Sequence, residues 1–158
     1  TTIPREFVER LVPHARAVAG DLGIPMKFLL GQAALESGWG RREPRFSDGS
    51  SSHNLFGIKA DRAWKGAVIE VATTEYVNGR AEVVKDRFRA YDSYADSLRD
   101  YADFLRSNPR YAQVLEGKHD AVGFARSLQQ AGYATDPRYA EKLAGVINGR
   151  SMRASLVA

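Results

Sequence analysis

The sequence predicts an α+β fold that is mostly helical, with a single β-hairpin inserted near the middle of the chain. Apolar residues recur at helical spacing in segments on both sides of that middle. Between residues 67 and 91, by contrast, β-forming residues gather around the turn dipeptide Asn78-Gly79. The 158 residues, 44% of them hydrophobic, are enough for one domain that needs no metal or disulfide to hold its core.

The first 37 residues are expected to form two helices. Thr2 is a candidate N-cap for the first helix, which Gly20 and Gly23 end. Pro25 opens the second helix, since a proline costs little in the first turn. That helix runs to Ser37, where Gly38 interrupts it.

The hairpin has a predictable register. A two-residue turn at Asn78-Gly79 pairs Glu70 with Arg87 and Ile69 with Phe88. A lone hairpin needs something to pack on, so we expect a small lobe beside the helical body with a groove between them. The register gives an apolar face of Ile69, Val71, Thr73, Glu75, Val84 and Phe88, and a charged face of Glu70, Lys85, Arg87 and Arg89.

Four helices are expected after the hairpin. Ser93 caps the longest, which Asn108-Pro109 ends. Shorter helices follow near residues 111–115 and 121–130, and the last begins at Asp136-Pro137.

One domain is expected to fill residues 1–150, followed by a frayed C-terminal tail at residues 151–158. The chain does not begin with Met and lacks a signal-peptide pattern, so we expect a processed protein or a domain of a longer one. No stretch approaches 18 apolar residues, and no membrane span is expected. A monomer is expected.

Composition and spacing exclude several classes of protein. There are no cysteines, which excludes disulfide scaffolds, Cys-based zinc sites and cysteine nucleophiles. The net charge is +4, but the basic residues are scattered and no nucleic-acid motif is present, so no nucleic-acid partner is expected. The three histidines, His14, His53 and His119, lack ligand spacing, and neither a metal nor another cofactor is expected.

Glu36 is the first candidate for chemistry. It follows Leu29 by seven residues, about two turns, which places a carboxylate on the apolar side of a helix. Apolar surroundings and a helix C-terminus both disfavour the charged form, as the general acid of a glycosidase requires. The alternative is that Glu36 marks the exposed last turn of the helix.

Glu75 is the second candidate carboxylate. It precedes the hairpin turn by three residues and shares the face of Ile69 and Phe88, although the pattern alone favours a solvated glutamate at a strand end. Aromatic residues also indicate a carbohydrate groove, because sugar rings stack on aromatic faces. About half of them are expected to belong to the core instead. Those in or beside loops are Trp39, Phe56, Trp64, Tyr76, Tyr91, Tyr133 and Tyr139.

Five motifs in order resemble the glucosaminidase domain of glycoside hydrolase family 73, over residues 3–147. The resemblance implies a lysozyme-like fold, with the hairpin lobe across a substrate groove. It also implies hydrolysis of the β-1,4 bond after N-acetylglucosamine in peptidoglycan. The motifs are Gln32-Ala33-Ala34-Leu35-Glu36-Ser37-Gly38-Trp39-Gly40, His53-Asn54-Leu55-Phe56-Gly57-Ile58-Lys59, Thr74-Glu75-Tyr76, Phe88-Arg89-Ala90-Tyr91-Asp92-Ser93 and Gly132-Tyr133-Ala134-Thr135-Asp136-Pro137-Arg138-Tyr139-Ala140.

The same resemblance implies roles for individual residues. It places the general acid at Glu36, a second functional carboxylate at Glu75 and an important tyrosine at Tyr133. Whether Glu75 activates water or the substrate's acetamido group assists stays open. Residues expected to line or support the substrate groove are Asn54, Phe56, Tyr91, Tyr139 and Trp39.

Within the family, the chain resembles the branch found in flagellar proteins. That branch implies a periplasmic setting, peptidoglycan glycan strands as substrate, and flagellar rod components as partners through an N-terminal domain absent from this sequence. Two alternatives stay open at this point. One is a lysozyme-like muramidase or lytic transglycosylase that cuts the other bond, and the second is a catalytically silent wall-binding module.

Overall fold

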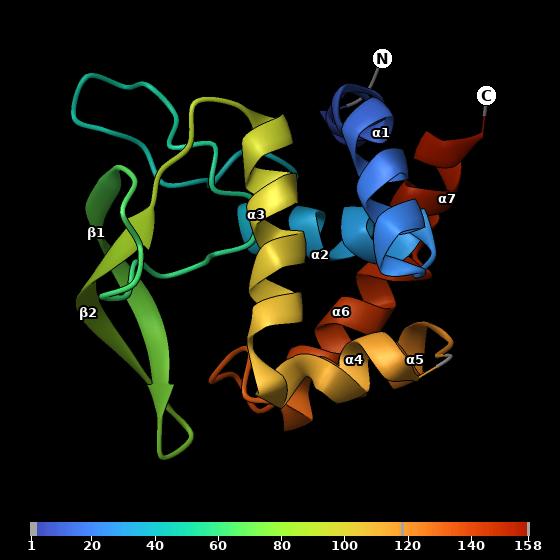
Figure 1. Cartoon of the computed structure of the whole chain (residues 1–158). Helices are drawn as coiled ribbons and strands as arrows, with labels where there is room; N and C mark the ends of the chain where they lie inside the picture. Colours follow the sequence, from blue (N-terminus) through green and yellow to red (C-terminus); the bar gives the residue numbers. More distant parts are fainter. Residues whose placement is uncertain (1–2, 118, 158) are drawn as a thin grey trace.

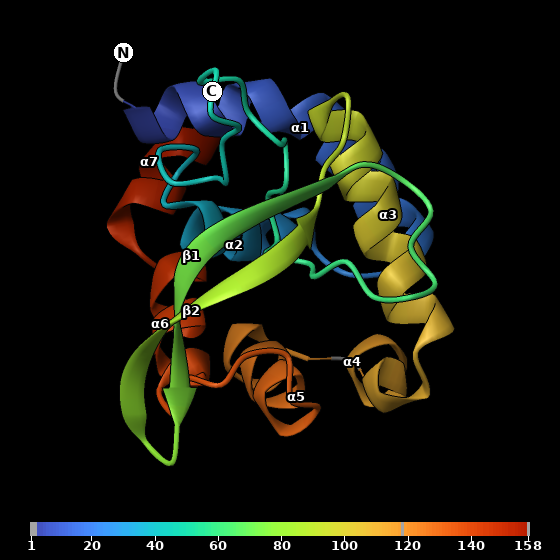
Figure 2. The same cartoon turned by 90° about the vertical axis from the view of Figure 1, so that its left-hand side faces the viewer.

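The protein consists of a helical body and a β-hairpin that lies to one side of it (Figure 1). This computed structural model describes residues 3–117 and 119–157, so the expected cap Thr2 lies outside the described residues. Turned by 90°, the hairpin crosses in front of α2 and α6 (Figure 2). The elements are α1 (Ile3–Leu22), α2 (Met26–Ser37), β1 (Val68–Val77), β2 (Arg80–Arg89), α3 (Tyr94–Ser107), η1 (Pro109–Tyr111), α4 (Ala112–Glu116), α5 (Ala121–Gln130), α6 (Tyr139–Ile147) and α7 (Arg150–Leu156).

Helix α2 runs through the centre of the helical body. Residues 28–34 are all buried, so this helix is buried around its whole circumference rather than along one stripe. Gly31 faces α6, where a Cβ would overlap the side chain of Ile147, so the two helices approach closely. Gly38 ends α2 in the left-handed conformation, with φ of 58°, and its N–H bonds to the carbonyl of Ala34.

The hairpin has the predicted register, with Glu70 opposite Arg87 and Ile69 opposite Phe88. Asn78 and Gly79 both have positive φ, 52° and 77°, as the expected two-residue turn demands. The apolar face is buried at its base, where a small second core forms. It consists of Ile69, Phe88 and Ala90, with Phe46 and Val71 packed against it.

One residue of the predicted charged face is not exposed. Arg89 retains only 9% of its surface, because the end of β2 enters the helical body. Its guanidinium lies 3.0 Å from a carboxylate oxygen of Asp100 on α3 and 4.8 Å from the ring centroid of Trp64. Arg89 therefore keeps its predicted place in the register, but it is buried because α3 supplies a counter-charge that the hairpin pattern cannot reveal.

The helices after the hairpin follow the expected caps. The side chain of Ser93 accepts the N–H of Asp96 at 3.1 Å, and α3 ends before Asn108. Helix α6 begins at Tyr139 rather than at Asp136-Pro137, because Asp136 forms a turn by accepting the N–H of Arg138.

The expected frayed C-terminal tail is wrong for most of its length. Residues 150–156 form α7, which packs on α1. Met152 retains 1% of its surface, and Arg5 of α1 donates to the carbonyl of Ala154 at 2.9 Å. Burial of one large apolar side chain and these helix contacts hold a segment whose sequence carries little periodicity.

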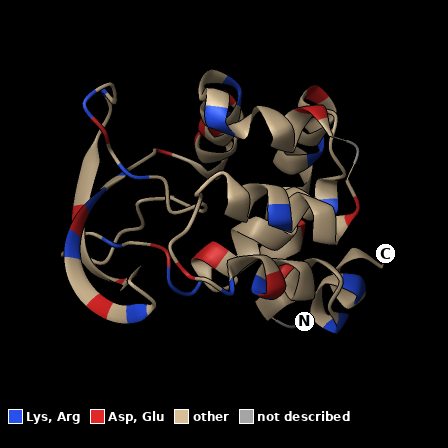
Figure 3. Ribbon diagram, turned by 90° about the horizontal axis from the view of Figure 1, so that it is seen from below, with Lys and Arg blue, Asp and Glu red and all other residues tan. Residues whose placement is uncertain are grey.

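Charges of both signs alternate along the hairpin and are spread over the helices (Figure 3). In residues 3–117 and 119–157, no helix is both long and apolar enough to cross a membrane. The same residues contain no group of three or more side chains placed to hold a metal ion.

Candidate active site

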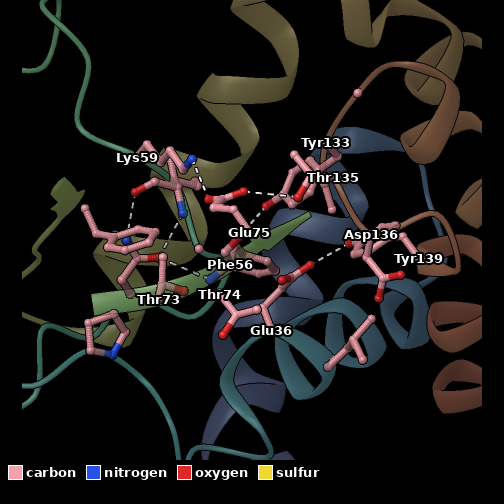
Figure 4. A pocket seen from close by; sticks show the side chains of 18 of the residues that line it. Glu36, Phe56, Lys59, Thr73, Thr74, Glu75, Tyr133, Thr135, Asp136 and Tyr139 are labelled. Carbon is pink, nitrogen blue, oxygen red and sulfur yellow. Dashed lines mark hydrogen bonds and ion pairs between the residues drawn. The ribbon is translucent and has the colours of Figure 1, made fainter. Parts of the chain in front are cut away.

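A groove of about 890 Å³ lies between the hairpin and the helical body. Its walls come from the end of α2, the loop at residues 54–61, the strand β1 and the segment from Gly132 to Tyr139. Glu36 from α2 and Glu75 from β1 both reach this groove (Figure 4). The predicted site residues that line it are Glu36, Asn54, Phe56, Glu75, Tyr133 and Tyr139.

Two predicted site residues lie elsewhere. Trp39 packs edge-on against Phe7 of α1, with ring centroids 6.0 Å apart, and belongs to the rim of the helical core. Tyr91 donates to Asp100 at 2.5 Å and borders a separate hollow beside Trp64. Neither side chain is brought to the groove, so their expected contact with substrate has no geometric support.

Glu36 lies in the last turn of α2, where its part-buried side chain lines the groove. The hydroxyl of Tyr139 donates to its Oε2 at 2.6 Å. Burial raises the pKa of Glu36 from 4.5 to about 7, and the hydrogen bond from Tyr139 offsets part of that rise. A large fraction of Glu36 is therefore protonated at neutral pH, which is the state a general acid needs.

The other oxygen of Glu36 faces the loop that follows Asn54. A Cβ at Gly57 would lie 3.8 Å from Oε1, and Gly57 itself lines the groove. Gly57 has φ of 66°, a conformation that glycine adopts without strain. Because position 57 has no side chain, none of its atoms covers Oε1 on this side.

Asn54 supports the groove rather than contacting its contents. The side chain retains 1% of its surface. Its amide donates to the carbonyls of Ile58 at 3.0 Å and Arg89 at 2.8 Å, while its oxygen accepts backbone N–H groups from within the loop. Asn54 therefore holds the loop of residues 54–58 against the end of β2.

Tyrosine side chains form the wall beside Glu36. The hydroxyl of Tyr133 donates to the carbonyl of Phe56 at 2.6 Å. Its ring stacks on Tyr139 with centroids 5.9 Å apart. Phe56 is fully buried and stacks on Tyr101, so it supports the wall and offers no open face to a sugar. Burial raises the pKa of Tyr133 and Tyr139 well above the usual range, so both keep their protons.

Glu75 is held by one partner from each side of the groove. Its Oε1 lies 2.7 Å from the ammonium of Lys59, which also pairs with Asp86 at 2.7 Å. Its Oε2 accepts from the hydroxyl of Thr135 at 3.1 Å, and that hydroxyl in turn accepts the N–H of Tyr76 at 2.9 Å. Thr135 therefore joins the hairpin to the segment before α6 (Figure 4).

Sequence reasoning missed three residues of this site. Lys59 and Thr135 stood inside recognised motifs but received no role. Gln32 is fully buried one turn before Glu36, and its amide donates to the hydroxyl of Tyr139 at 3.0 Å. The spacing of four residues between Gln32 and Glu36 could have indicated that the two side chains lie together, because residues i and i+4 share a helix face.

A family profile and several known proteins match this chain. The profile, described as glucosaminidase (mannosyl-glycoprotein endo-beta-N-acetylglucosaminidase), matches residues 12–151. The peptidoglycan hydrolase FlgJ of Escherichia coli O157:H7 is 49% identical over 143 residues, 90% of this chain and 45% of that protein. The exo-glucosaminidase LytG of Bacillus subtilis is 32% identical, over 89% of this chain and 49% of that protein. The chain thus spans about half the length of these relatives.

Solved structures are similar over nearly the whole chain. A crystal structure of a peptidoglycan hydrolase mutant from Sphingomonas sp. A1 has 53% identity and a TM-score of 0.92, covering 96% of this chain and 97% of that one. A C-terminally truncated glycoside hydrolase domain of FlgJ from Salmonella typhimurium has 49% identity and a TM-score of 0.73, covering 91% and 95%. The fold of the helical body and hairpin is therefore shared with glycoside hydrolase domains.

Proposed function

Because the chain belongs to the glucosaminidase family of glycoside hydrolases, family 73, we propose that it hydrolyses the β-1,4 bond between N-acetylglucosamine and N-acetylmuramic acid in peptidoglycan. The observation that carries this proposal is Glu36, a carboxyl group with a pKa of about 7 that opens into the groove. Relatives named peptidoglycan hydrolase and exo-glucosaminidase support the substrate and the bond.

Glu36 acts as the general acid. It transfers its proton to the glycosidic oxygen while the bond from that oxygen to the anomeric carbon breaks. Water supplies a hydroxyl group to the anomeric carbon, and the proton that water loses restores the protonated carboxyl group over the full cycle. The tyrosine wall favours this role because it excludes water and keeps Glu36 neutral until the bond breaks.

Glu75 is the second functional carboxylate. Both of its oxygens are engaged, one by Lys59 and one by Thr135. To activate water as a general base, Glu75 must exchange one of these partners for the water molecule. In the alternative route the acetamido group of the substrate attacks the anomeric carbon, with Tyr133 orienting that group and Glu75 stabilising the positive charge.

The similarity to FlgJ supports a role in opening the cell wall for the flagellar rod. In that setting the enzyme works in the periplasm, and rod components bind a part of the whole protein that lies outside this chain. Within this chain, the groove binds the glycan strand alone.

The bond that is cut is tested by digesting purified peptidoglycan, reducing the products with borohydride and identifying the new terminal alditol. The proposal expects N-acetylglucosaminitol. N-acetylmuramitol would identify a muramidase, and anhydro-muramic ends would identify a lytic transglycosylase. A Glu36→Gln sample processed in parallel supplies the background of pre-existing ends.

A further inference from the structure

A chain of buried hydrogen bonds runs from α3 through α2 to the carboxyl group of Glu36. The hydroxyl of Tyr101 donates to Oε1 of Gln32. The amide nitrogen of Gln32 donates to the hydroxyl of Tyr139 at 3.0 Å, which donates to Oε2 of Glu36 at 2.6 Å. Tyr101 and Gln32 are fully buried and Tyr139 retains 4% of its surface, so water does not compete for the two contacts of Gln32.

Each hydrogen bond in this series can form in one direction only. The Gln32 amide nitrogen carries only hydrogens to donate, so the Tyr139 oxygen must accept from it. A hydroxyl has a single hydrogen, and that hydrogen of Tyr139 is left for Oε2 of Glu36. Tyr101 fixes the amide in this orientation by donating to its oxygen. Oε2 of Glu36 is therefore an acceptor whether or not Glu36 is protonated.

We propose that Gln32 is a positioning residue that, through Tyr139, keeps the transferable proton of Glu36 on Oε1, the oxygen that faces the groove. This rests on the proposed role of Glu36 as general acid. Oε1 is the oxygen beside Gly57, where no side chain intervenes. Because Oε2 accepts the hydrogen bond from the Tyr139 hydroxyl, the Glu36 proton stays on Oε1. There it can be donated to the glycosidic oxygen of a substrate in the groove, and it does not point toward α6.

Other titratable groups surround Glu36 but do not supply this contact. Tyr101 of α3 and Tyr133 before α6 face it from the helical body, and both stay protonated. Lys59, Asp61 and Glu75 line the groove on the hairpin side.

On the helical side, Arg42, Arg110, Asp136 and Lys142 line the same groove. Among the described residues, the hydrogen bond that reaches a Glu36 oxygen comes from Tyr139. The protonation of Glu36 is therefore expected to respond to changes at Gln32 through Tyr139.

The test is the pH dependence of kcat/KM for Gln32→Met, a side chain of similar length without polar hydrogens. Tyr139 is then free to turn and accept a proton from Oε2, which stabilises the neutral, misdirected form of Glu36. The alkaline side of the kcat/KM profile, called the high-pH limb, should therefore shift to higher pH by roughly half to one pH unit. At the optimum, kcat should fall roughly 3–10-fold with KM little changed, a small part of what positioned proton transfer contributes.

A double-mutant cycle separates positioning from packing. In a Tyr139→Phe background the relay, meaning the hydrogen bonds from Gln32 through Tyr139 to Glu36, is already broken. Gln32→Met should then change neither the high-pH limb of kcat/KM nor kcat. Equal losses in both backgrounds, or a high-pH limb that does not move in the single variant, would overturn the proposal. Thermal unfolding of each variant checks that it is folded at the assay temperature.

Two further comparisons keep the test decisive. Should Gln32→Met fail to fold, Tyr101→Phe frees the amide to turn over and should move the limb upward by a smaller amount, while an unmoved limb contradicts the relay. Activity that survives in Glu36→Gln contradicts the proposed general acid itself. If Glu36→Gln is inactive and the Gln32→Met profile matches wild type, the relay alone fails.

Discussion

The hydroxyl group of Tyr139, on α6, donates a 2.6 Å hydrogen bond to Oε2 of Glu36, the penultimate residue of α2. The two residues lie 103 positions apart in the chain. They meet because Gly31 lets α6 approach α2 closely at Ile147. The proton affinity of the candidate general acid therefore depends on how these two helices pack.

Removal of the Tyr139 hydroxyl should make Glu36 a weaker acid. The hydrogen bond from Tyr139 lowers the pKa of Glu36, so Tyr139→Phe should raise it above about 7. We expect the high-pH limb of kcat/KM to move upward by roughly 0.5–1 pH unit. The matched variant Tyr133→Phe loses a hydroxyl that bonds to the Phe56 carbonyl instead, and its limb should stay in place whatever its rate. A limb that moves equally in both variants would contradict the assignment.

Glu36 should also make stability depend on pH. Its folded-state pKa of about 7 lies above the ordinary value of 4.5, so the neutral form is the one that folding favours. Its contribution is fully present below pH 4.5 and is lost as pH rises through 7. Relative to wild type, Glu36→Gln should therefore gain about 3 kcal/mol of unfolding free energy between pH 4 and pH 8.

Urea unfolding at the two pH values measures this difference. Glu9→Gln removes an exposed carboxylate from α1 and should show no comparable gain. An equal pH dependence in wild type and Glu36→Gln would contradict the raised pKa.

The second carboxylate should affect turnover more than binding. Glu75→Gln keeps the shape of the side chain but weakens the contact with Lys59 and removes one negative charge from the groove. We expect kcat to fall by about 10²-fold or more, with KM changed little. The control is Glu82→Gln, which removes a charge from the exposed residue directly opposite on β2. Turnover near wild type in Glu75→Gln would reduce Glu75 to a structural residue of the hairpin.

The close packing of α2 and α6 should tolerate no side chain at position 31. A Cβ at Gly31 would overlap Ile147, so Gly31→Ala should lose about 1–3 kcal/mol of unfolding free energy. Gly20→Ala, at an open position in α1, should instead gain up to about 1 kcal/mol. Chemical denaturation of both variants measures the contrast. Equal effects would show that helix propensity, and not the α2–α6 contact, determines the result at Gly31.

Local sequence signals predicted the hairpin and most helix ends. The dipeptide Asn78-Gly79 determined the turn, and the alternating side chains on either side determined the register. Ser93 and Gly38 marked a helix start and a helix end because their roles depend on the adjacent backbone alone. The candidate acid Glu36 could be singled out because a carboxylate on an apolar helix is itself unusual.

Features that depend on distant segments were not predicted. The burial of Arg89 requires Asp100 from α3, and the helix at residues 150–156 requires the surface of α1. The relay through Gln32 joins three helices, so no single stretch of sequence contains it. Trp39 and Tyr91 were expected at the groove because of their motifs, but core packing and the Asp100 contact hold them elsewhere.

The most direct measurement is the rate at which Glu36→Gln releases reducing ends from peptidoglycan, compared with wild type at the same pH. The glutamine keeps the size of the side chain but cannot donate an acidic proton. The rate should fall by about 10²–10⁴-fold or more, with the protein folded and still bound to the cell wall. Release of reducing ends at the wild-type rate would contradict Glu36 as the general acid.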